Sequence, residues 1–176
     1  DVLALSGRVP GLYAESSNGR SAPRFYIRGL GNIDFDLAAS QPVSLIMDEV
    51  VMENVVLKSF PIFDMEQVEV IRGPQGTLFG KNTTGGVIHV VRGDVTGEFG
   101  GKVSATVGSD GREDVQGVLN LPLGENGGIK LFANSISSDG YFYNTTLNEK
   151  VFGDDKTTFG AAIRWEPTEN FDVQLH

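Results

Sequence analysis

The chain has 176 residues, with 23 Asp and Glu against 14 Lys and Arg, so its formal net charge is -9. This acidic balance argues against a nucleic-acid partner, because proteins that bind phosphate backbones usually carry a basic face. The lack of cysteine excludes disulfides, thiolate zinc sites and iron–sulfur clusters. No apolar run approaches the roughly 20 residues that a membrane-spanning helix needs, although the alternating strands of a membrane β-barrel would never produce such a run.

Short apolar runs separated by irregular Gly-, Asn- and Ser-rich stretches fill the first part of the chain, up to residue 95. A short helix is predicted over Asp1–Leu5, and strands are predicted over Phe25–Arg28, Val43–Val51, Val68–Arg72 and Val87–Val91. We also expect one helical turn over Phe63–Gln67, because Asp64 is a good N-cap residue. Short strands with little helix indicate a small α+β domain.

Apolar and polar residues alternate with a period of two after residue 95, which is typical of strands with one apolar face. The apolar positions include Val103, Ala105, Val107, Val115, Leu119, Leu121, Phe159, Ala161, Ile163, Trp165, Phe171, Val173 and Leu175. Ile129–Ser138 alternates less cleanly, because Phe132 and Ile136 fall at even-numbered positions whereas Ile129 and Leu131 fall at odd-numbered ones. Tight turns and one long connection, from Asp139 to Lys156, are typical of an outer-membrane barrel. A soluble β-sandwich has the same alternation, so the pattern alone leaves both open.

One segment, Val68–Val91, reads VEVIRGPQGTLFGKNTTGGVIHVV. It closely resembles the C-terminal half of the plug domain of TonB-dependent outer-membrane receptors, where RGPQG, an aromatic–Gly pair and an N-x-x-GG stretch follow an apolar strand. Upstream motifs of that family have counterparts at Val9–Leu12, Phe25–Gly29 and Leu45–Val50. Glu49 stands where the third of these motifs usually has Gly.

The resemblance implies two domains. Residues 1–95 would be the plug, a small mixed sheet with short helices, and residues 96–176 the first antiparallel strands of an incomplete transmembrane β-barrel. Plugged barrels of this type have about 22 strands, so most of the barrel is expected outside this chain. A signal peptide and the TonB-binding box are expected upstream of Asp1.

Two arginines, Arg28 and Arg72, each end a predicted strand and precede a Gly. In the family, the matching arginines pair with barrel glutamates and lock the plug in place. A buried arginine needs such a partner, because an unpaired buried charge is costly. The alternative interpretation is a pair of exposed strand-end arginines.

The plug loops that face the ligand in this family map onto residues 16–23, 32–41 and 52–56. The resemblance implies ligand contacts for Asn32, Asp34, Phe35, Asp36, Gln41, Glu53 and Asn54, and the alternative is an ordinary solvated loop. A third set of predicted residues consists of glycines that provide a positive φ or a close approach of the backbone. These are Gly29, Gly73, Gly76, Gly80, Gly85 and Gly86.

The sequence does not indicate an enzyme, a metal site or a cofactor. Gly76–Asn82 resembles a phosphate-binding loop but has Asn82 where that motif needs Ser or Thr after Lys. The two histidines, His89 and His176, are isolated from any nucleophile–base pattern.

The resemblance therefore implies a receptor of the Gram-negative outer membrane that imports a scarce ligand, with TonB and its inner-membrane complex supplying the energy. We expect the ligand to be a ferric siderophore or a similar iron complex, and the surroundings to be outer-membrane lipid. Two alternatives remain from other classes: a stand-alone plug fragment that scavenges a ligand, and a soluble β-sandwich adhesin or carbohydrate-binding domain. Poor solubility without detergent is expected of the barrel strands and not of the sandwich.

Overall fold

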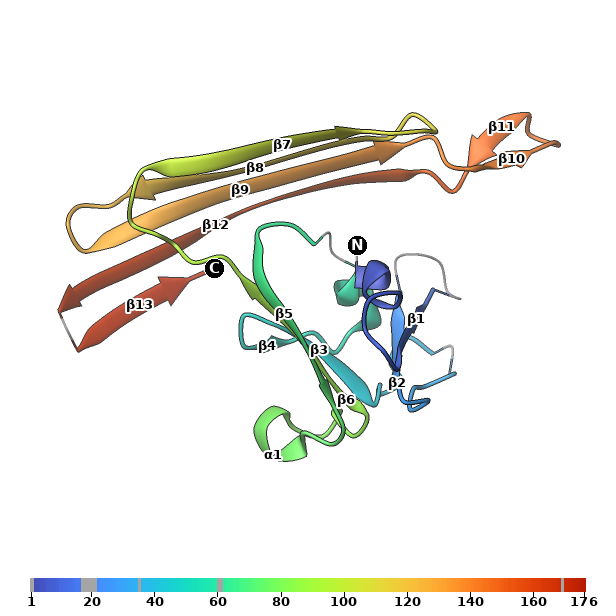
Figure 1. Ribbon diagram of the computed structural model, residues 1–176, viewed down its shortest axis with the longest axis horizontal. Helices are drawn as coiled ribbons and strands as arrows, with labels where there is room; N and C mark the ends of the chain where they lie inside the picture. The colour runs from blue at the N-terminus through green and yellow to red at the C-terminus, as the bar shows by residue number, and fades with distance from the viewer. Residues whose placement is uncertain (1, 17–21, 35, 60–61, 169) are drawn as a thin grey trace. The chain divides into compact units, whose positions relative to one another are not determined.

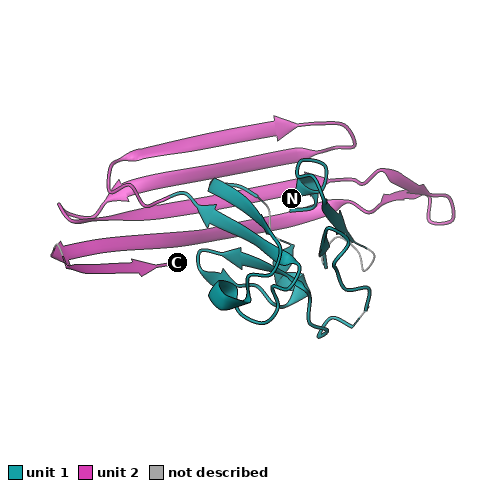
Figure 2. Cartoon of the chain, turned by 60° about the horizontal axis from the view of Figure 1, so that its bottom comes forward, with its two compact units in different colours: residues 1–93 teal, residues 94–176 magenta. Residues whose placement is uncertain are grey.

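The computed structural model describes residues 2–16, 22–34, 36–59, 62–168 and 170–176. The chain divides into two compact units, residues 1–93 and residues 94–176 (Figure 2). Each unit is described by itself. None of the helices in the described ranges is long and apolar enough to cross a membrane.

The first unit is built around a four-stranded mixed sheet with the order β4-β3-β6-β5 (Figure 1). Its strands are β3 (Val43–Met47), β4 (Val50–Val51), β5 (Met65–Arg72) and β6 (Gly86–Arg92). β3 and β6 run parallel, whereas β4 and β5 join the sheet in the antiparallel direction. This arrangement is the α+β class that the sequence predicted.

A second, two-stranded sheet and three short helical elements complete this unit. β1 (Leu12–Glu15) and β2 (Arg24–Ile27) form the antiparallel pair. The helical elements are η1 (Val2–Leu5), η2 (Val55–Lys58) and α1 (Gly76–Phe79).

The core of the first unit lies where the two sheets and η1 meet. It contains Val2, Leu12, Phe25, Ile27, Val43, Leu45, Ile88 and Val90. Because side chains alternate along a strand, Ile88 and Val90 enter this core while His89 lies on the opposite face of β6. The apolar runs of the sequence therefore become buried strands, as burial of apolar surface favours.

The predicted helical turn over Phe63–Gln67 is wrong, because β5 begins at Met65. Asp64 does not cap a helix; its φ is 53° and its carbonyl accepts a 2.9 Å hydrogen bond from the N–H of Gly93. Met65 is then paired with Arg92. Pairing with β6 satisfies the backbone groups that a helical turn would otherwise have satisfied.

Five antiparallel strands form the main sheet of the second unit, in the order β13-β12-β9-β8-β7 (Figure 1). They are β7 (Gly100–Val107), β8 (Glu113–Pro122), β9 (Gly127–Ser138), β12 (Asp154–Thr168) and β13 (Phe171–Leu175). The alternation in the sequence therefore predicted the strands of this sheet correctly.

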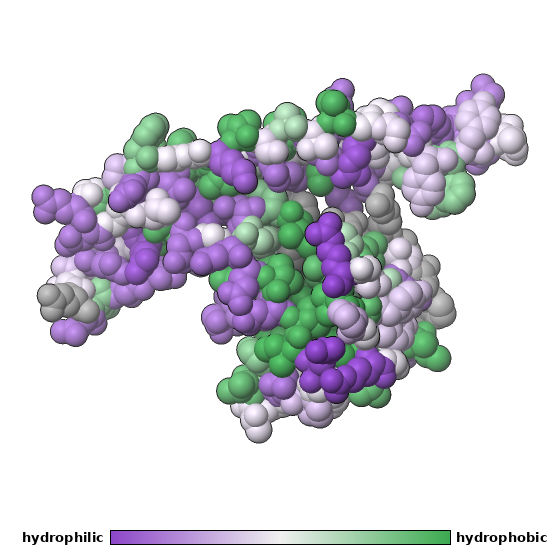
Figure 3. Space-filling model, in the orientation of Figure 1, coloured by the Kyte–Doolittle hydropathy of each residue, from purple (hydrophilic) through white to green (hydrophobic). Residues whose placement is uncertain are grey.

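The register of this sheet places the alternating apolar residues on one face. Leu119 lies opposite Leu131, which in turn lies opposite Ala161, across three adjacent strands. Side chains on this face are open, with Val103 81% and Phe159 82% exposed, and Figure 3 shows green, hydrophobic side chains standing out along the sheet. A large exposed apolar face of this kind marks a surface that contacts lipid or another apolar partner.

The connection from Asp139 to Lys156 was expected to be a long loop and contains a hairpin instead. β10 (Phe142–Asn144) pairs with β11 (Glu149–Val151). The turn between these strands is held by Asn144, whose Oδ1 accepts hydrogen bonds from the backbone N–H groups of Thr146 (2.9 Å) and Leu147 (3.0 Å). Such Asn turns compete well with an open loop.

Phe132 has the wrong parity for the apolar face because it covers a glycine on the other face. Its register partner on β12 is Gly160, and a Cβ added to Gly160 would lie 2.4 Å from Phe132 Cζ. Phe132 is only 9% exposed. An aromatic ring that lies over a cross-strand glycine buries backbone and fixes the register of the strand pair.

Gly160→Val is expected to destabilise the second unit by about 1–3 kcal/mol, because the new side chain overlaps the Phe132 ring. The measurement is denaturant unfolding in detergent, followed by fluorescence of Trp165, the single tryptophan. Ala161→Val is the matched control, since Ala161 is exposed on the apolar face. Equal stability of the two variants would show that Phe132 does not need the space above Gly160.

Candidate functional site

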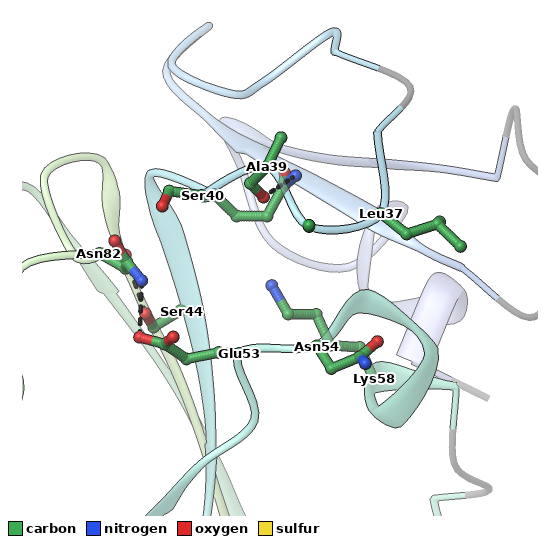
Figure 4. Close-up of a pocket in the computed structure, with 10 residues that line it drawn as sticks. Leu37, Ala39, Ser40, Ser44, Glu53, Asn54, Lys58 and Asn82 are labelled. Carbon is green, nitrogen blue, oxygen red and sulfur yellow. Dashed lines mark hydrogen bonds between the residues drawn. The ribbon is translucent and has the colours of Figure 1, made fainter.

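A pocket of about 260 Å³ lies within the first unit, between segments 37–44 and 53–58 and Asn82 (Figure 4). Its polar lining consists largely of Gln41, Ser44, Glu53, Asn54, Lys58 and Asn82. Three of these, Gln41, Glu53 and Asn54, are among the residues predicted from the sequence to face a ligand. The structure therefore brings residues from two of the three predicted loops to one pocket.

Hydrogen bonds between separate segments hold this pocket in shape. Ser44 Oγ donates to the carbonyl of Asn82 at 2.8 Å, and Asn82 Nδ2 donates to Glu53 Oε1 at 2.6 Å. Asn54 caps η2, because its Oδ1 accepts a 3.0 Å hydrogen bond from the N–H of Val56. This cap sets the start of the helical turn that carries Lys58.

Lys58 is a buried cation beside the pocket, with 1% of its surface exposed. Its Nζ donates one long hydrogen bond, 3.5 Å, to the carbonyl of Val43. Burial lowers the pKa of Lys58 from 10.5 to about 8, and the carboxylate of Glu53 partly opposes this change. The sequence did not single out Lys58, and lysine is rarely buried to this extent.

Gln41 is the second buried polar side chain of the pocket, with 5% of its surface exposed. Its Nε2 donates to the carbonyl of Ala39 at 3.3 Å. Its Oε1 is buried and has no hydrogen-bond partner among the described residues. An unsatisfied buried acceptor is costly, so this oxygen is available to a ligand donor.

The predicted ligand residues Asn32, Asp34 and Asp36 do not line this pocket. Asn32 Oδ1 accepts the N–H of Asp34 at 2.8 Å, and Asp34 Oδ1 accepts the N–H of Asp36 at 3.0 Å. Their side chains therefore shape their own loop. Phe35 lies outside the described residues, as does most of the predicted loop 16–23.

Both predicted lock arginines contact the turn at Pro10-Gly11. The backbone N–H of Arg28 donates to the carbonyl of Gly11 at 2.8 Å, and Arg72 Nη1 donates to the carbonyl of Pro10 at 3.3 Å. Both arginines are exposed. Within the described ranges, neither forms an ion pair with a carboxylate.

Five of the six predicted glycines have a conformation or an environment that disfavours a side chain. Positive φ values occur at Gly29 (82°), Gly73 (110°), Gly80 (87°) and Gly86 (146°). A Cβ on Gly85 would lie 3.2 Å from Val43 Cγ2 and 3.3 Å from the carbonyl oxygen of Pro42. Gly76 has neither feature, since it begins α1 in open space.

Arg24 and Tyr26 hold the loop that follows β2, and the sequence did not single them out. Arg24 Nη1 donates to the carbonyl of Asn32 at 3.1 Å. The Tyr26 hydroxyl donates its one hydrogen to Glu15 Oε1, at 2.8 Å, and its oxygen lies 3.2 Å from the carbonyl oxygen of Asn32. Burial, together with this bond to Glu15, raises the pKa of Tyr26. Arg24 and Tyr26 alternate along β2 with the core residues Phe25 and Ile27. This alternation in the sequence indicates that their side chains lie on the other face of the strand.

His89 lies between two glutamates on the other face of the sheet. Its Nδ1 is 3.3 Å from Glu69 Oε2, and its Nε2 is 3.8 Å from Glu49 Oε1. No group of three or more His, Asp or Glu side chains in the described part of the chain is arranged to hold a metal ion.

Comparison with known proteins identifies the family. Residues 1–87 match the family model described as TonB-dependent Receptor Plug Domain. The vitamin B12 transporter BtuB of Vibrio vulnificus is 28% identical in an alignment of 183 positions, gaps included, that covers 93% of this chain and 29% of the relative. The vitamin B12 transporter BtuB of Photobacterium profundum is 28% identical in an alignment of 145 positions that covers 80% of this chain and 23% of the relative.

A solved structure shares the fold of nearly the whole chain. The ferric yersiniabactin uptake receptor FyuA from Yersinia pestis matches 95% of this chain, and 26% of its own, with a TM-score of 0.85 and 23% identity. The chain spans about a quarter of the length of these relatives. The relatives are receptors and transporters rather than enzymes. The chain therefore belongs to the TonB-dependent receptors, with a plug domain that begins in its first residues and is followed by antiparallel strands.

Proposed function

We propose that this chain is part of an importer in the Gram-negative outer membrane, with a plug over residues 1–95 that gates a barrel begun by residues 96–176. TonB and its inner-membrane complex would supply the energy by acting on the plug. The observation that carries the proposal is the plug-family match of residues 1–87, together with the open apolar face of the sheet in the second unit. Outer-membrane lipid is the natural partner for that face.

The imported ligand is proposed to be a ferric siderophore or a similar iron complex. The likeness to the ferric yersiniabactin uptake receptor supports this class. Vitamin B12 is the second candidate, because both sequence relatives are named vitamin B12 transporters. The polar pocket at Gln41, Glu53 and Lys58 is the proposed point of contact between the plug and either ligand.

Uptake by living cells separates these ligands. The full-length protein is expressed in a Gram-negative host that lacks its own siderophore and vitamin B12 receptors, with and without TonB. We expect uptake of radioactive iron from one of a panel of ferric siderophores, and only in the host with TonB. Uptake of labelled vitamin B12 instead would select the second candidate, and TonB-independent uptake of either would overturn the proposed function.

Arg28 and Arg72 are proposed to lock the plug by pairing with barrel carboxylates. Their position at one turn supports this role. Arg28 and Arg72 are exposed in this chain, and the proposed pairs would be buried only inside a complete barrel. Arg28→Ala with Arg72→Ala is then expected to loosen the plug, because loss of one side of a buried ion pair costs about 3–5 kcal/mol. The readout is ion conductance of the full-length protein in planar bilayers, which should rise in the double variant. Arg8→Ala, at another exposed arginine of the first unit, is the control, and conductance equal to that control would contradict the lock.

A further inference from the structure

Two buried polar groups with opposite requirements line the same pocket. Lys58 Nζ is a cationic donor whose hydrogen bond to the carbonyl of Val43 is 3.5 Å long. Gln41 Oε1 is an acceptor without a partner among the described residues. Buried groups of both kinds are normally satisfied in folded proteins. A ligand that accepts from one and donates to the other would satisfy both.

The charges around the pocket favour an anionic group at Lys58. Glu53 is the only other charged residue among those described as lining the pocket. It is exposed, and its Oε1 accepts the hydrogen bond from Asn82 Nδ2. Lys58 is 1% exposed, so its attraction for an anion is little screened by solvent.

The size of the pocket limits what part of a ligand enters. Its volume is about 260 Å³, whereas pockets that enclose a whole drug-sized ligand have about 300–1,000 Å³. The pocket therefore suits one functional group or one arm of a larger ligand.

We propose that this pocket binds an oxyanion with a neighbouring hydrogen-bond donor, of which an α-hydroxycarboxylate is the simplest example. The oxyanion accepts from Lys58 Nζ, and the adjacent O–H or N–H donates to Gln41 Oε1. This rests on the proposed function, because it names the chemical class of the ligand that the plug meets. Lys58 and Gln41 are then specificity-determining residues.

Citrate and tricarballylate test the proposal, because they carry the same three carboxylates and differ only in the citrate hydroxyl. Binding to the full-length protein in detergent is measured by calorimetry. We expect citrate to bind about tenfold more tightly than tricarballylate, as one hydrogen bond to a buried group allows. Equal affinities would overturn the donor part of the proposal.

Three variants test which residues account for the affinities for citrate and tricarballylate. Lys58→Met is expected to weaken citrate binding by about tenfold or more, since it removes a charged hydrogen bond. Gln41→Met should bring citrate affinity down to that of tricarballylate and leave tricarballylate unchanged. Glu53→Gln should strengthen both, because it removes a neighbouring negative charge. Lys81→Met, at an exposed lysine outside the pocket, is the control.

The pH dependence gives a second readout that a purely structural role of Lys58 would not produce. The pKa of Lys58 is lowered to about 8, so the protonated amine that attracts an anion is lost as the pH rises through 8. Citrate affinity should therefore fall between pH 7 and 9 in the wild type more than in Lys58→Met. Circular dichroism and thermal unfolding verify that each variant is folded.

The outcomes separate this inference from the proposed function. No saturable citrate binding, or equal citrate affinity in the wild type and Lys58→Met, would overturn the inference and would leave TonB-dependent uptake untouched. Citrate binding with the expected variant effects in a protein that fails to import any ligand would instead overturn the proposed function alone.

Discussion

Gly86→Ala is expected to destabilise the first unit by on the order of 3–5 kcal/mol, because it combines backbone strain with steric overlap. Gly86 has a φ of 146°, a region that residues with a Cβ rarely enter. The added Cβ would lie 2.4 Å from the carbonyl oxygen of Ile71 and 2.7 Å from Ile27 Cδ1. Ile71 O belongs to the neighbouring strand β5, so it cannot move away without disturbing the β5–β6 pairing.

Amide hydrogen exchange measures this effect locally, since slow exchange in β5 and β6 reports opening of their hydrogen bonds. The variant should lose protection in both strands. Gly76→Ala is the matched control: it lies in the same motif, has open space around it and begins α1. Ala favours helix over Gly by about 0.5–1 kcal/mol, so this control should be neutral or slightly stabilising. Unchanged protection in Gly86→Ala would contradict the close approach.

Lys58→Met is expected to stabilise the first unit at pH 7 by as much as about 3 kcal/mol. Lys58 is buried, and its pKa falls from 10.5 to about 8, which corresponds to about 3 kcal/mol against the charged form. Below pH 8 the folded state carries this cost. Between pH 8 and 10.5 the unfolded state binds a proton that the folded state does not, so wild-type stability should rise with pH.

The measurement is denaturant unfolding of wild type and variant at pH 7 and pH 10. The stability difference between them should shrink at pH 10, where Lys58 has lost most of its charge. Other titrating groups cancel in that difference. Lys81→Met, at an exposed lysine, should show no such convergence. A wild type that is more stable than Lys58→Met at both pH values would show that the ammonium is well satisfied in the fold.

The strands of the second unit were predictable because each places its apolar residues on one face. Burial of one face and exposure of the other leave a period of two in the sequence, and the observed register follows it. Even the exception at Phe132 has a local cause, the bare glycine opposite it. The hairpin at 142–151 escaped prediction because its strands have three residues each, too few for an alternation.

In the first unit, a single polar residue led to a wrong helix prediction, because the same residue type occurs in more than one local structure. Asp64 was interpreted as an N-cap, yet Asp also tolerates a positive φ at the start of a strand. Tertiary pairing of Met65 with Arg92 decided between the two. Local preference is a weak guide where a neighbouring strand can complete the backbone hydrogen bonds.

The loop residues of the candidate site could be predicted from the sequence, whereas its buried lysine could not. Gln41, Glu53 and Asn54 stood out as polar residues in loops that the family resemblance pointed to. Lys58 lies in the run VVLK, where the sequence contains no sign that the lysine is buried. Its burial depends on tertiary contacts, such as the one between its Nζ and the carbonyl of Val43 in β3.

The parallel pairing of β3 with β6 has a consequence for the order of folding. β3 and β6 are far apart in the sequence, because β4, η2, β5 and α1 lie between Val43 and its register partner Gly86. β5 and β6, in contrast, are joined by one short connection. Contacts that are distant in sequence form late, because a long loop must close first. In a partly folded chain we therefore expect the edge of strand Val43–Met47 that faces β6 to remain without its backbone hydrogen bonds. Apolar strands with such an open edge tend to associate with other molecules. Val43–Met47 is therefore the strand at which unwanted association of the partly folded chain is expected to begin.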